Sequence, residues 1–306
     1  MKIIFLLLQF ALIIALAPLI SGVIAKIKNN LRMRKGAPVI QPYYNLVKLF
    51  SKEEVISGTA SWIFRITPFV VLASTLTALF LALAVFAGNP AGLAGEFLAI
   101  IFILGVGRFF LSLAGLDAGS SFGGMGSSRE VFISSLAEPV ACLAVFALFL
   151  QTGTTNLESF GALNYPRLAS ILAGMVLLMV IIAETSRLPI DNQETHLELT
   201  MIHEAMVLEY SGRSLAFIEL ASYLKQLAWF VILGYILFPA PAGFSGGIFS
   251  FLSPGLFFLG KILLISAVVA VLEVLIAKMR LFRVMDYFGF AFVLGVLAIT
   301  AAIMGI

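Results

Sequence analysis

Ionisable side chains interrupt long apolar runs of this sequence, where such groups are rarely found. They are Arg108, Glu138, Glu184, Glu219, Lys225 and Glu273. Ionisable groups inside a membrane are costly and are functional candidates by default. The acids outnumber the bases, and a carboxyl in a low-dielectric setting without a cation holds its proton up to a higher pH. The pattern therefore predicts groups that take up and release protons.

Static ion pairs are the alternative interpretation for any one of these residues. Arg108 with Glu138, or Glu219 with Lys225, would each satisfy a buried charge without moving a proton. This alternative is weaker for the whole set, because too few bases are present to pair every acid.

The stretch 184–212, ETSRLPIDNQETHLELTMIHEAMVLEYSG, holds six of the 16 acidic residues. Asp191, Glu194 and Glu198 are spaced i, i+3, i+7 and would share one face of a helix. A run of charges usually marks a solvated face. Here the interleaved leucines, methionines and isoleucine indicate partial burial, which favours a proton path or a partner surface.

Metal and nucleotide sites are not expected in this chain. Cys142 is the only cysteine, whereas iron–sulfur clusters need about four thiolates. His196 and His203, the only histidines, do not form the His-Glu-x-x-His spacing of a zinc site. The stretch GSSFGGMGSS at 119–128 lacks the Gly-Lys-Ser/Thr of a phosphate loop.

The composition predicts the elements that must position these groups. Of 306 residues, 61% are hydrophobic and 11% are charged, with a mean hydropathy of +1.10. Soluble domains carry about 25% charged residues, so a soluble enzyme, a disordered chain and a nucleic-acid binder are excluded. We expect residues 1–306 to form one all-α polytopic membrane domain with eight transmembrane helices. Their ranges are 3–25, 66–87, 93–116, 131–152, 167–187, 215–238, 256–278 and 286–305.

The basic residues predict the orientation of these spans. Fourteen of the nineteen lysines and arginines fall in four alternate connections, beginning with 26–65. The positive-inside rule places those connections in the cytoplasm and both termini outside. The chemistry should therefore face the cytoplasm, in the basic connection 26–65 and the acidic stretch 184–214. Within the former, segment 40–52 has apolar residues at helical spacing, which predicts a helix lying in the membrane interface or packed on protein.

Three motifs resemble a known family. AETSRLPIDNQETHLEL followed by LEYSG is similar to the signature of the complex I membrane subunit at the quinone-site junction. GSSREVF at 126–132 is similar to a segment of that subunit that supplies an acid, here Glu130. RKGAPVIQPYYNLVKLF at 34–50 resembles its Arg-Arg-Gly-Pro to Lys-Leu-Phe segment. The resemblance runs from about residue 30 to residue 283.

Departures from the complex I pattern point to one branch of the family. Gly36-Ala37-Pro38 runs almost directly into Gln41-Pro42, and Glu138 precedes Pro139. This shortened form resembles subunit 4 of formate hydrogenlyase and related membrane subunits of energy-converting nickel–iron hydrogenases. His196 stands where the family has an acid, and a few extra residues precede Glu209.

The resemblance implies a cofactor-free subunit that anchors a cytoplasmic redox arm in a prokaryotic cytoplasmic membrane and couples electron transfer to proton or sodium movement. The implied partners are hydrogenase-like large and small subunits, which would hold the nickel–iron centre and iron–sulfur clusters, antiporter-like membrane subunits and the lipid bilayer. The expected proton-transfer residues are Glu130, Glu138, Glu184, Asp191, Glu194, His196, Glu198 and Glu209. The expected supporting ion pairs involve Arg108, Arg187, Glu219, Lys225 and Glu273. The expected arm contacts are Arg32, Arg34, Lys35, Gln41 and Lys48.

Three other functions remain open on the sequence. A quinone-reactive subunit of a complex I-like dehydrogenase would use aromatic residues such as Tyr43, Tyr44 and Trp62 at a lipid-facing entrance. A static anchor would keep its carboxylates permanently paired. A stand-alone transporter is disfavoured, because the sequence has no clear internal repeat and no matching pair of broken spans.

Overall fold

The computed structural model describes residues 2–84, 96–161, 167–191, 201–238 and 248–305. Within these ranges the chain is helical and has no β-strand beyond one isolated bridge between Glu96 and Asn156. The helices are α1 Lys2–Leu31, α2 Gln41–Phe50, α3 Trp62–Ala84, α4 Phe97–Asp117, α5 Ser121–Thr152, α6 Leu157–Gly161, α7 Leu168–Glu184, α8 His203–Val207, α9 Gly212–Leu237, α10 Ile248–Leu275 and α11 Arg283–Met304. The predicted all-α class is confirmed.

Each of the eight predicted spans coincides with one long helix. Seven of the described helices are long and apolar enough to cross a membrane: α1, α3, α4, α5, α9, α10 and α11. The eighth, α7, is an apolar helix of only 17 residues. It lies at the lower limit of about 17 residues for a spanning helix.

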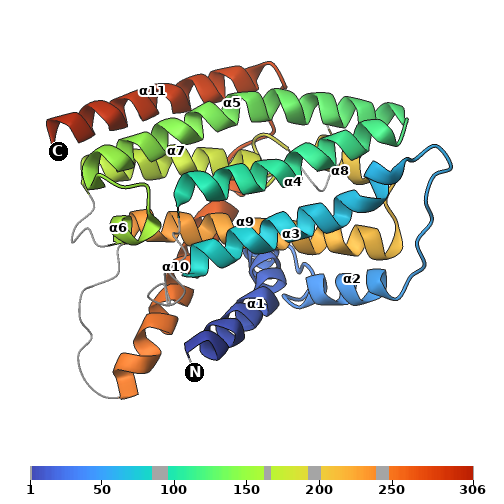
Figure 1. Ribbon diagram of the computed structural model, residues 1–306, viewed down its shortest axis with the longest axis horizontal. Coiled ribbons are helices and arrows are strands. Elements are labelled where there is room, and N and C mark those ends of the chain that lie inside the picture. The colour runs from blue at the N-terminus through green and yellow to red at the C-terminus, as the bar shows by residue number, and fades with distance from the viewer. Residues whose placement is uncertain (1, 85–95, 162–166, 192–200, 239–247, 306) are drawn as a thin grey trace.

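The long helices pack around α9, which is buried over 72% of its span. Figure 1 shows α11, α5, α4 and α3 running lengthwise one below another, while α1 and α10 cross them steeply at the lower edge. Helix α9 contacts α1, α2, α3, α7 and α10. Its residues Trp229 and Phe230 are fully buried, and the neighbouring Gln226 is held within the protein interior.

Small residues allow α4 to approach both of its neighbours closely. A Cβ added to Gly107 of α4 would meet Ser74 Oγ of α3 at 2.3 Å. A Cβ added to Gly123 of α5 would meet the carbonyl oxygen of Gly115 on α4 at 2.2 Å. Membrane helices pack closely where such small residues meet. These contacts hold Arg108, next to Gly107, at the centre of the bundle.

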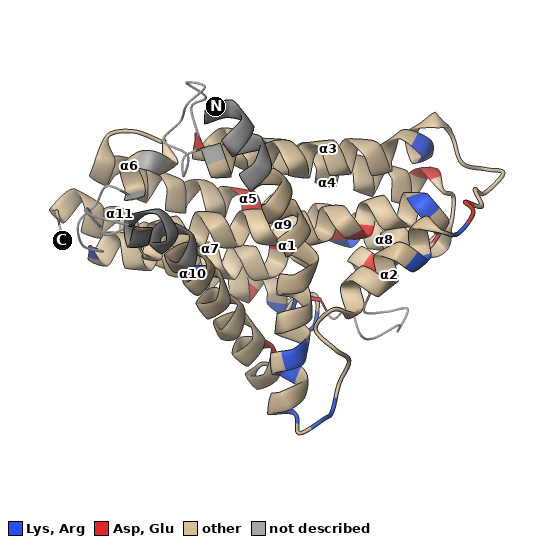
Figure 2. Ribbon diagram, turned by 90° about the horizontal axis from the view of Figure 1, so that it is seen from below, with Lys and Arg blue, Asp and Glu red and all other residues tan. Residues whose placement is uncertain are grey.

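The four connections that are rich in basic residues meet at one end of the molecule. The Ser211 hydroxyl accepts a hydrogen bond from the Val55 backbone N–H at 2.8 Å. Arg129 donates to the Met201 carbonyl at 2.8 Å, and the Met279 N–H donates to the Pro189 carbonyl at 2.9 Å. Figure 2 shows charged residues gathered around α2, around α8 and at the end of α1, with few near α6 and the C-terminus. Which end faces the cytoplasm stays a prediction.

Candidate functional site

Arg108 on α4 joins two carboxylates from other helices. Its guanidinium donates one hydrogen bond to Glu184 at the end of α7. It donates a second to Glu138 Oε1 on α5 at 3.1 Å. Arg108 and Glu184 are buried, whereas 46% of the Glu138 side chain is exposed. Because a guanidinium stays protonated in proteins, Arg108 is a fixed positive charge between the two acids.

Lys225 on α9 binds the other oxygen of Glu184, with Nζ 3.0 Å from Oε2. The interpretation that Lys225 pairs with Glu219 is wrong. The two residues are six positions apart on α9, so their side chains point about 120° away from each other around the helix. Glu219 instead accepts a hydrogen bond from the Tyr223 hydroxyl at 2.9 Å, from a residue four positions along and on the same helical face.

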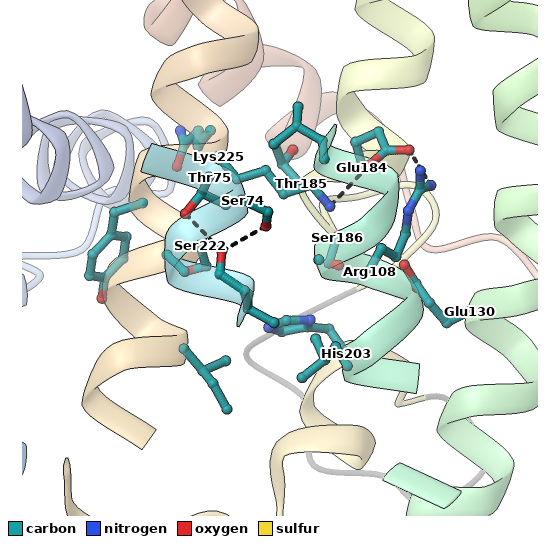
Figure 3. A pocket seen from close by; sticks show the side chains of 18 of the residues that line it. Ser74, Thr75, Arg108, Glu130, Glu184, Thr185, Ser186, His203, Ser222 and Lys225 are labelled. Carbon is teal, nitrogen blue, oxygen red and sulfur yellow. Dashed lines mark hydrogen bonds and ion pairs between the residues drawn. The ribbon is translucent and has the colours of Figure 1, made fainter. Parts of the chain in front are cut away.

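A cavity of about 60 Å³ lies beside this network, between α3, α4, α5 and α9 (Figure 3). Its ionisable lining residues include Arg108, Glu130, Glu184, Arg187, His203 and Lys225. Its hydroxyl-bearing lining residues include Ser21, Ser74, Thr75, Thr185, Ser186 and Ser222. A cavity of this volume has room for about four water molecules. The site is therefore a polar chamber in which buried charges and hydroxyl groups face one another.

A second ion-pair cluster lies where α1, α9 and α10 meet. Glu273 on α10 is 4% exposed and is bound by two cations. Lys28 Nζ lies 3.2 Å from one of its oxygens, and Arg187 donates to the other. Arg187 also donates to Gln226 Oε1 at 2.9 Å. The predicted pairing of Glu273 is thus formed with partners from α1 and from the connection after α7.

Asp191 is buried but does not line the cavity. Its carboxylate binds Lys278 Nζ at 3.0 Å and accepts the backbone N–H groups of Ile202 and His203 at 3.3 and 3.1 Å. These contacts fix the start of α8. The carboxylate therefore has a visible structural task, apart from its predicted role in proton transfer.

Glu209 lies between α8 and α9 and is also not among the residues that line the cavity. Its neighbour Tyr210 is buried, stacks on Phe64 with ring centroids 3.9 Å apart, and donates to the Phe64 carbonyl at 2.9 Å. The Glu-Tyr motif thus fastens the α8–α9 connection to α3. The predicted residues Glu194, His196 and Glu198 lie outside the described residues.

Two neighbouring groups on α8 have displaced pKa values. Burial, together with the nearby positive charge of Lys225, lowers the pKa of His203 to about 4, against the opposing effect of Asp191. Burial and the negative charges of Glu219 and Asp191 raise the pKa of Glu204 to about 7. His203 faces the cavity beside Glu130 (Figure 3). The sequence predictions did not include either residue as a site residue.

Comparison with known proteins gives the family. The family model described as NADH dehydrogenase matches residues 1–305. This chain belongs to the NADH dehydrogenase family.

Two proteins of Escherichia coli strain K12 are similar to this chain over nearly its whole length. Hydrogenase-4 component C is 30% identical, and the match covers 97% of this chain and 94% of the relative. Formate hydrogenlyase subunit 4 is 29% identical, over 95% of this chain and 97% of the relative. NADH-quinone oxidoreductase subunit 8 of Rhodothermus marinus is 30% identical over 64% of this chain. The resemblance drawn from the motifs is confirmed.

A chain of the membrane-bound sulfane sulfur reductase, an archaeal respiratory membrane complex, has the same fold. The TM-score is 0.82 with 17% identity, covering 98% of this chain and 99% of that chain. This NADH dehydrogenase family member is accordingly a multi-pass membrane protein of the kind found in prokaryotic oxidoreductase complexes. Among the residues that the structure describes, no group of three His, Cys, Asp or Glu side chains is placed to hold a metal ion.

The basic connection of this family member has an exposed surface. Arg34, Lys35 and Lys48 are exposed, and Arg32 is partly exposed. Helix α2 carries Lys48 and begins at Gln41. The helix packs by Leu46 and by the Tyr43 hydroxyl, which donates to the Ala15 carbonyl of α1. Its Tyr44 and Val47 are 62% and 69% exposed, so α2 packs on the protein along one face and is exposed along the other.

Proposed function

We propose that this chain is the membrane subunit of a complex I-like energy-converting hydrogenase and couples electron transfer in a cytoplasmic arm to proton translocation. In this function the chain holds no cofactor. A nickel–iron centre and iron–sulfur clusters belong to partner subunits of the arm, and antiporter-like subunits lie beside the chain in the membrane.

The charge balance around the cavity carries the proposal. Around Arg108, three carboxyl groups, Glu130, Glu138 and Glu184, face two cations, Arg108 and Lys225. Arg187, the third cation of the cavity lining, is bound to Glu273. An uncompensated buried charge costs several kcal/mol. One additional proton on this set neutralises it, and that proton is shared among carboxyls linked through Arg108 and the cavity. The set can therefore be loaded and unloaded without breaking the fold.

Glu138 is the suggested outlet of the path. It is bound to Arg108, yet almost half of its side chain is exposed on an apolar helix. An exposed carboxylate within a membrane span is costly unless a polar partner covers it. An adjacent membrane subunit with a polar or ionisable side chain would cover Glu138 and accept its proton.

The exposed basic connection is the proposed binding surface for the cytoplasmic arm. Arg34, Lys35 and Lys48 are exposed in the basic connection between α1 and α3. Charged rims guide association and fix register more than they add affinity. The triple change R34A/K35A/K48A should release the arm from membranes at moderate salt while leaving the membrane subunit folded.

Glu138→Gln in the intact complex tests the proposal, because it keeps the shape and removes the titratable group. Inverted membrane vesicles receive reduced methyl viologen, and hydrogen evolution and acidification of the lumen are recorded together. The protons moved per hydrogen evolved should fall at least about tenfold. Hydrogen evolution itself should continue.

Glu96→Gln provides the matched control. Glu96 is an exposed acid before α4, its side chain makes no capping hydrogen bond, and it does not line the cavity. The control should translocate protons at the wild-type ratio. A wild-type ratio in Glu138→Gln would overturn the proposed coupling role.

Quinone reduction by a complex I-like dehydrogenase is the alternative. The NADH-quinone oxidoreductase relative from Rhodothermus marinus matches 64% of this chain, whereas the hydrogenase-4 relative matches 97%. The longer match favours the hydrogenase branch. Quinone-dependent, hydrogen-independent turnover of the purified complex would favour the alternative.

A further inference from the structure

Tyr223 is the side chain that joins the cavity to a pair of acids outside it. Tyr223 is one of the residues that line the cavity, and its hydroxyl donates to Glu219 Oε2 at 2.9 Å. Neither Glu219 nor Glu204 lines the cavity. The Tyr223 side chain therefore links the chamber to a carboxylate outside it.

Glu204 and Glu219 come together from two different elements. Glu204 is on α8 and Glu219 is on α9, and both are partly buried. Burial, followed by the negative charges of Glu219 and Asp191, raises the pKa of Glu204 to about 7. Two neighbouring carboxyls in a partly buried setting favour a state in which one of them is protonated.

The cavity contains polar atoms that require a further partner. Gln226 Nε2 and Arg187 Nε are buried and have no hydrogen-bond partner among the residues that the structure describes, and both residues line the cavity. Gln226 is 5% exposed. Buried donors of this kind are usually satisfied by ordered water, and the volume suits about four water molecules. Water is thus the occupant that the lining demands.

We propose that protons reach the cavity water from Glu219 through the Tyr223 hydroxyl. This inference rests on the proposed function and assigns the inlet of the same path. The residues Glu204, Glu219 and Tyr223 have no role in the ion-pair network around Arg108.

The transfer balances without a co-reactant. A proton on Glu219 passes to the Tyr223 oxygen as the tyrosine proton passes to a cavity water. One O–H bond forms and one breaks at the hydroxyl, so the tyrosine stays neutral. The excess proton on water is then within the chamber lined by Glu130 and Glu184. Rotation of the hydroxyl restores its bond to Glu219.

Tyr223→Phe in the intact complex tests the inlet, because it removes only the hydroxyl. Hydrogen evolution from reduced methyl viologen and lumen acidification are measured in inverted vesicles. Protons moved per hydrogen evolved should fall at least about tenfold. Glu219→Gln, which keeps an acceptor for the hydroxyl but cannot carry the proton, should fall by a similar factor.

Tyr287→Phe is the matched control. Tyr287 on α11 is partly buried and donates to the Met179 carbonyl at 3.0 Å, away from the cavity lining. The Tyr287→Phe complex should move as many protons per hydrogen evolved as the wild type. A wild-type ratio in both Tyr223→Phe and Glu219→Gln would overturn the inlet.

The outcome also separates this inference from the proposed function. A loss in Glu138→Gln with no loss in Tyr223→Phe would leave the coupling role intact and remove the inlet. No loss in either variant would remove both. A loss in Tyr223→Phe accompanied by the same loss in Tyr287→Phe would mean that helix packing is responsible, which also overturns the inlet.

Discussion

The two buried ion-pair clusters differ in which charge is in excess. Around Arg108, two cations bind Glu138 and Glu184, and a third carboxyl group, Glu130, lines the adjacent cavity, which has room for water. Around Glu273, one carboxylate is bound by two cations, Lys28 and Arg187. The first cluster accepts another proton at little cost, whereas protonating Glu273 would leave two buried cations facing a neutral group.

This difference separates a proton carrier from a clamp. A buried ion pair contributes little net stability but is expensive to break. The Glu273 cluster joins α1, α10 and the connection after α7, so we assign it to holding these elements together. The Arg108 cluster joins α4, α5, α7 and α9, and its surplus carboxyl gives it a chemical task as well.

The largest effect is expected for Glu184→Gln. It leaves Arg108 with Glu138 alone and leaves Lys225 without its carboxylate. Breaking a buried pair in this way costs up to about 5 kcal/mol. The thermal midpoint of the purified complex should fall, and proton translocation should be lost in the fraction that assembles. Wild-type thermal stability would contradict the central place given to Glu184.

A smaller effect on stability, with no effect on coupling, is expected for Glu273→Gln. The change leaves Lys28 and Arg187 facing an amide and should cost about 3 kcal/mol. The same thermal and vesicle assays apply. If the number of protons moved per hydrogen evolved fell as far in Glu273→Gln as in Glu138→Gln, the two clusters would not differ in function.

A pH-dependent effect on stability is expected at Glu204, whose pKa is raised to about 7. Folding favours the neutral carboxyl. Below the ordinary carboxyl pKa both states hold the proton, and as the pH rises to about 7 the unfolded chain loses it first. Stability should fall by roughly 2 kcal/mol across this interval.

Glu204→Gln removes this dependence of stability on pH. The difference in thermal midpoint between the variant and the wild type should therefore change between acid and neutral pH. The groups facing Glu204 are Glu219 of α9 and Asp191 before α8. His203 adds its own loss of stability on the acid side, because its pKa is lowered to about 4. That contribution is present in both proteins and cancels in their difference. Parallel profiles would contradict the raised pKa.

Hydropathy predicted the long helices because each span is a continuous apolar run. The pairing of Arg108 with Glu138 could also be suggested from the sequence, because opposite charges inside apolar runs are stabilised when they form an ion pair. The partner of Lys225 did not follow, because proximity in the sequence suggested Glu219 while helical geometry turns the two apart. A count of residues per turn would have rejected that pair and selected Tyr223.

The cavity lining was harder to predict than the spans. Ser74 and Thr75 are hydroxyl residues in an apolar run, which was a usable signal. His203 lines the same cavity as these two residues because it lies at the start of α8. Its backbone N–H is held there by a hydrogen bond to Asp191. Contacts of this kind depend on tertiary packing and leave no periodic trace in the sequence.

We expect the Arg108 cluster to hold an exchangeable proton and the Glu273 cluster to hold none. Infrared difference spectroscopy of the intact complex during turnover, in H₂O and D₂O, reads the carbonyl stretch of protonated carboxyl groups directly. We expect a deuterium-sensitive band that is altered in Glu130→Gln and Glu138→Gln and unchanged in Glu273→Gln. A band that persists in the first two variants and disappears in the third would contradict this expectation.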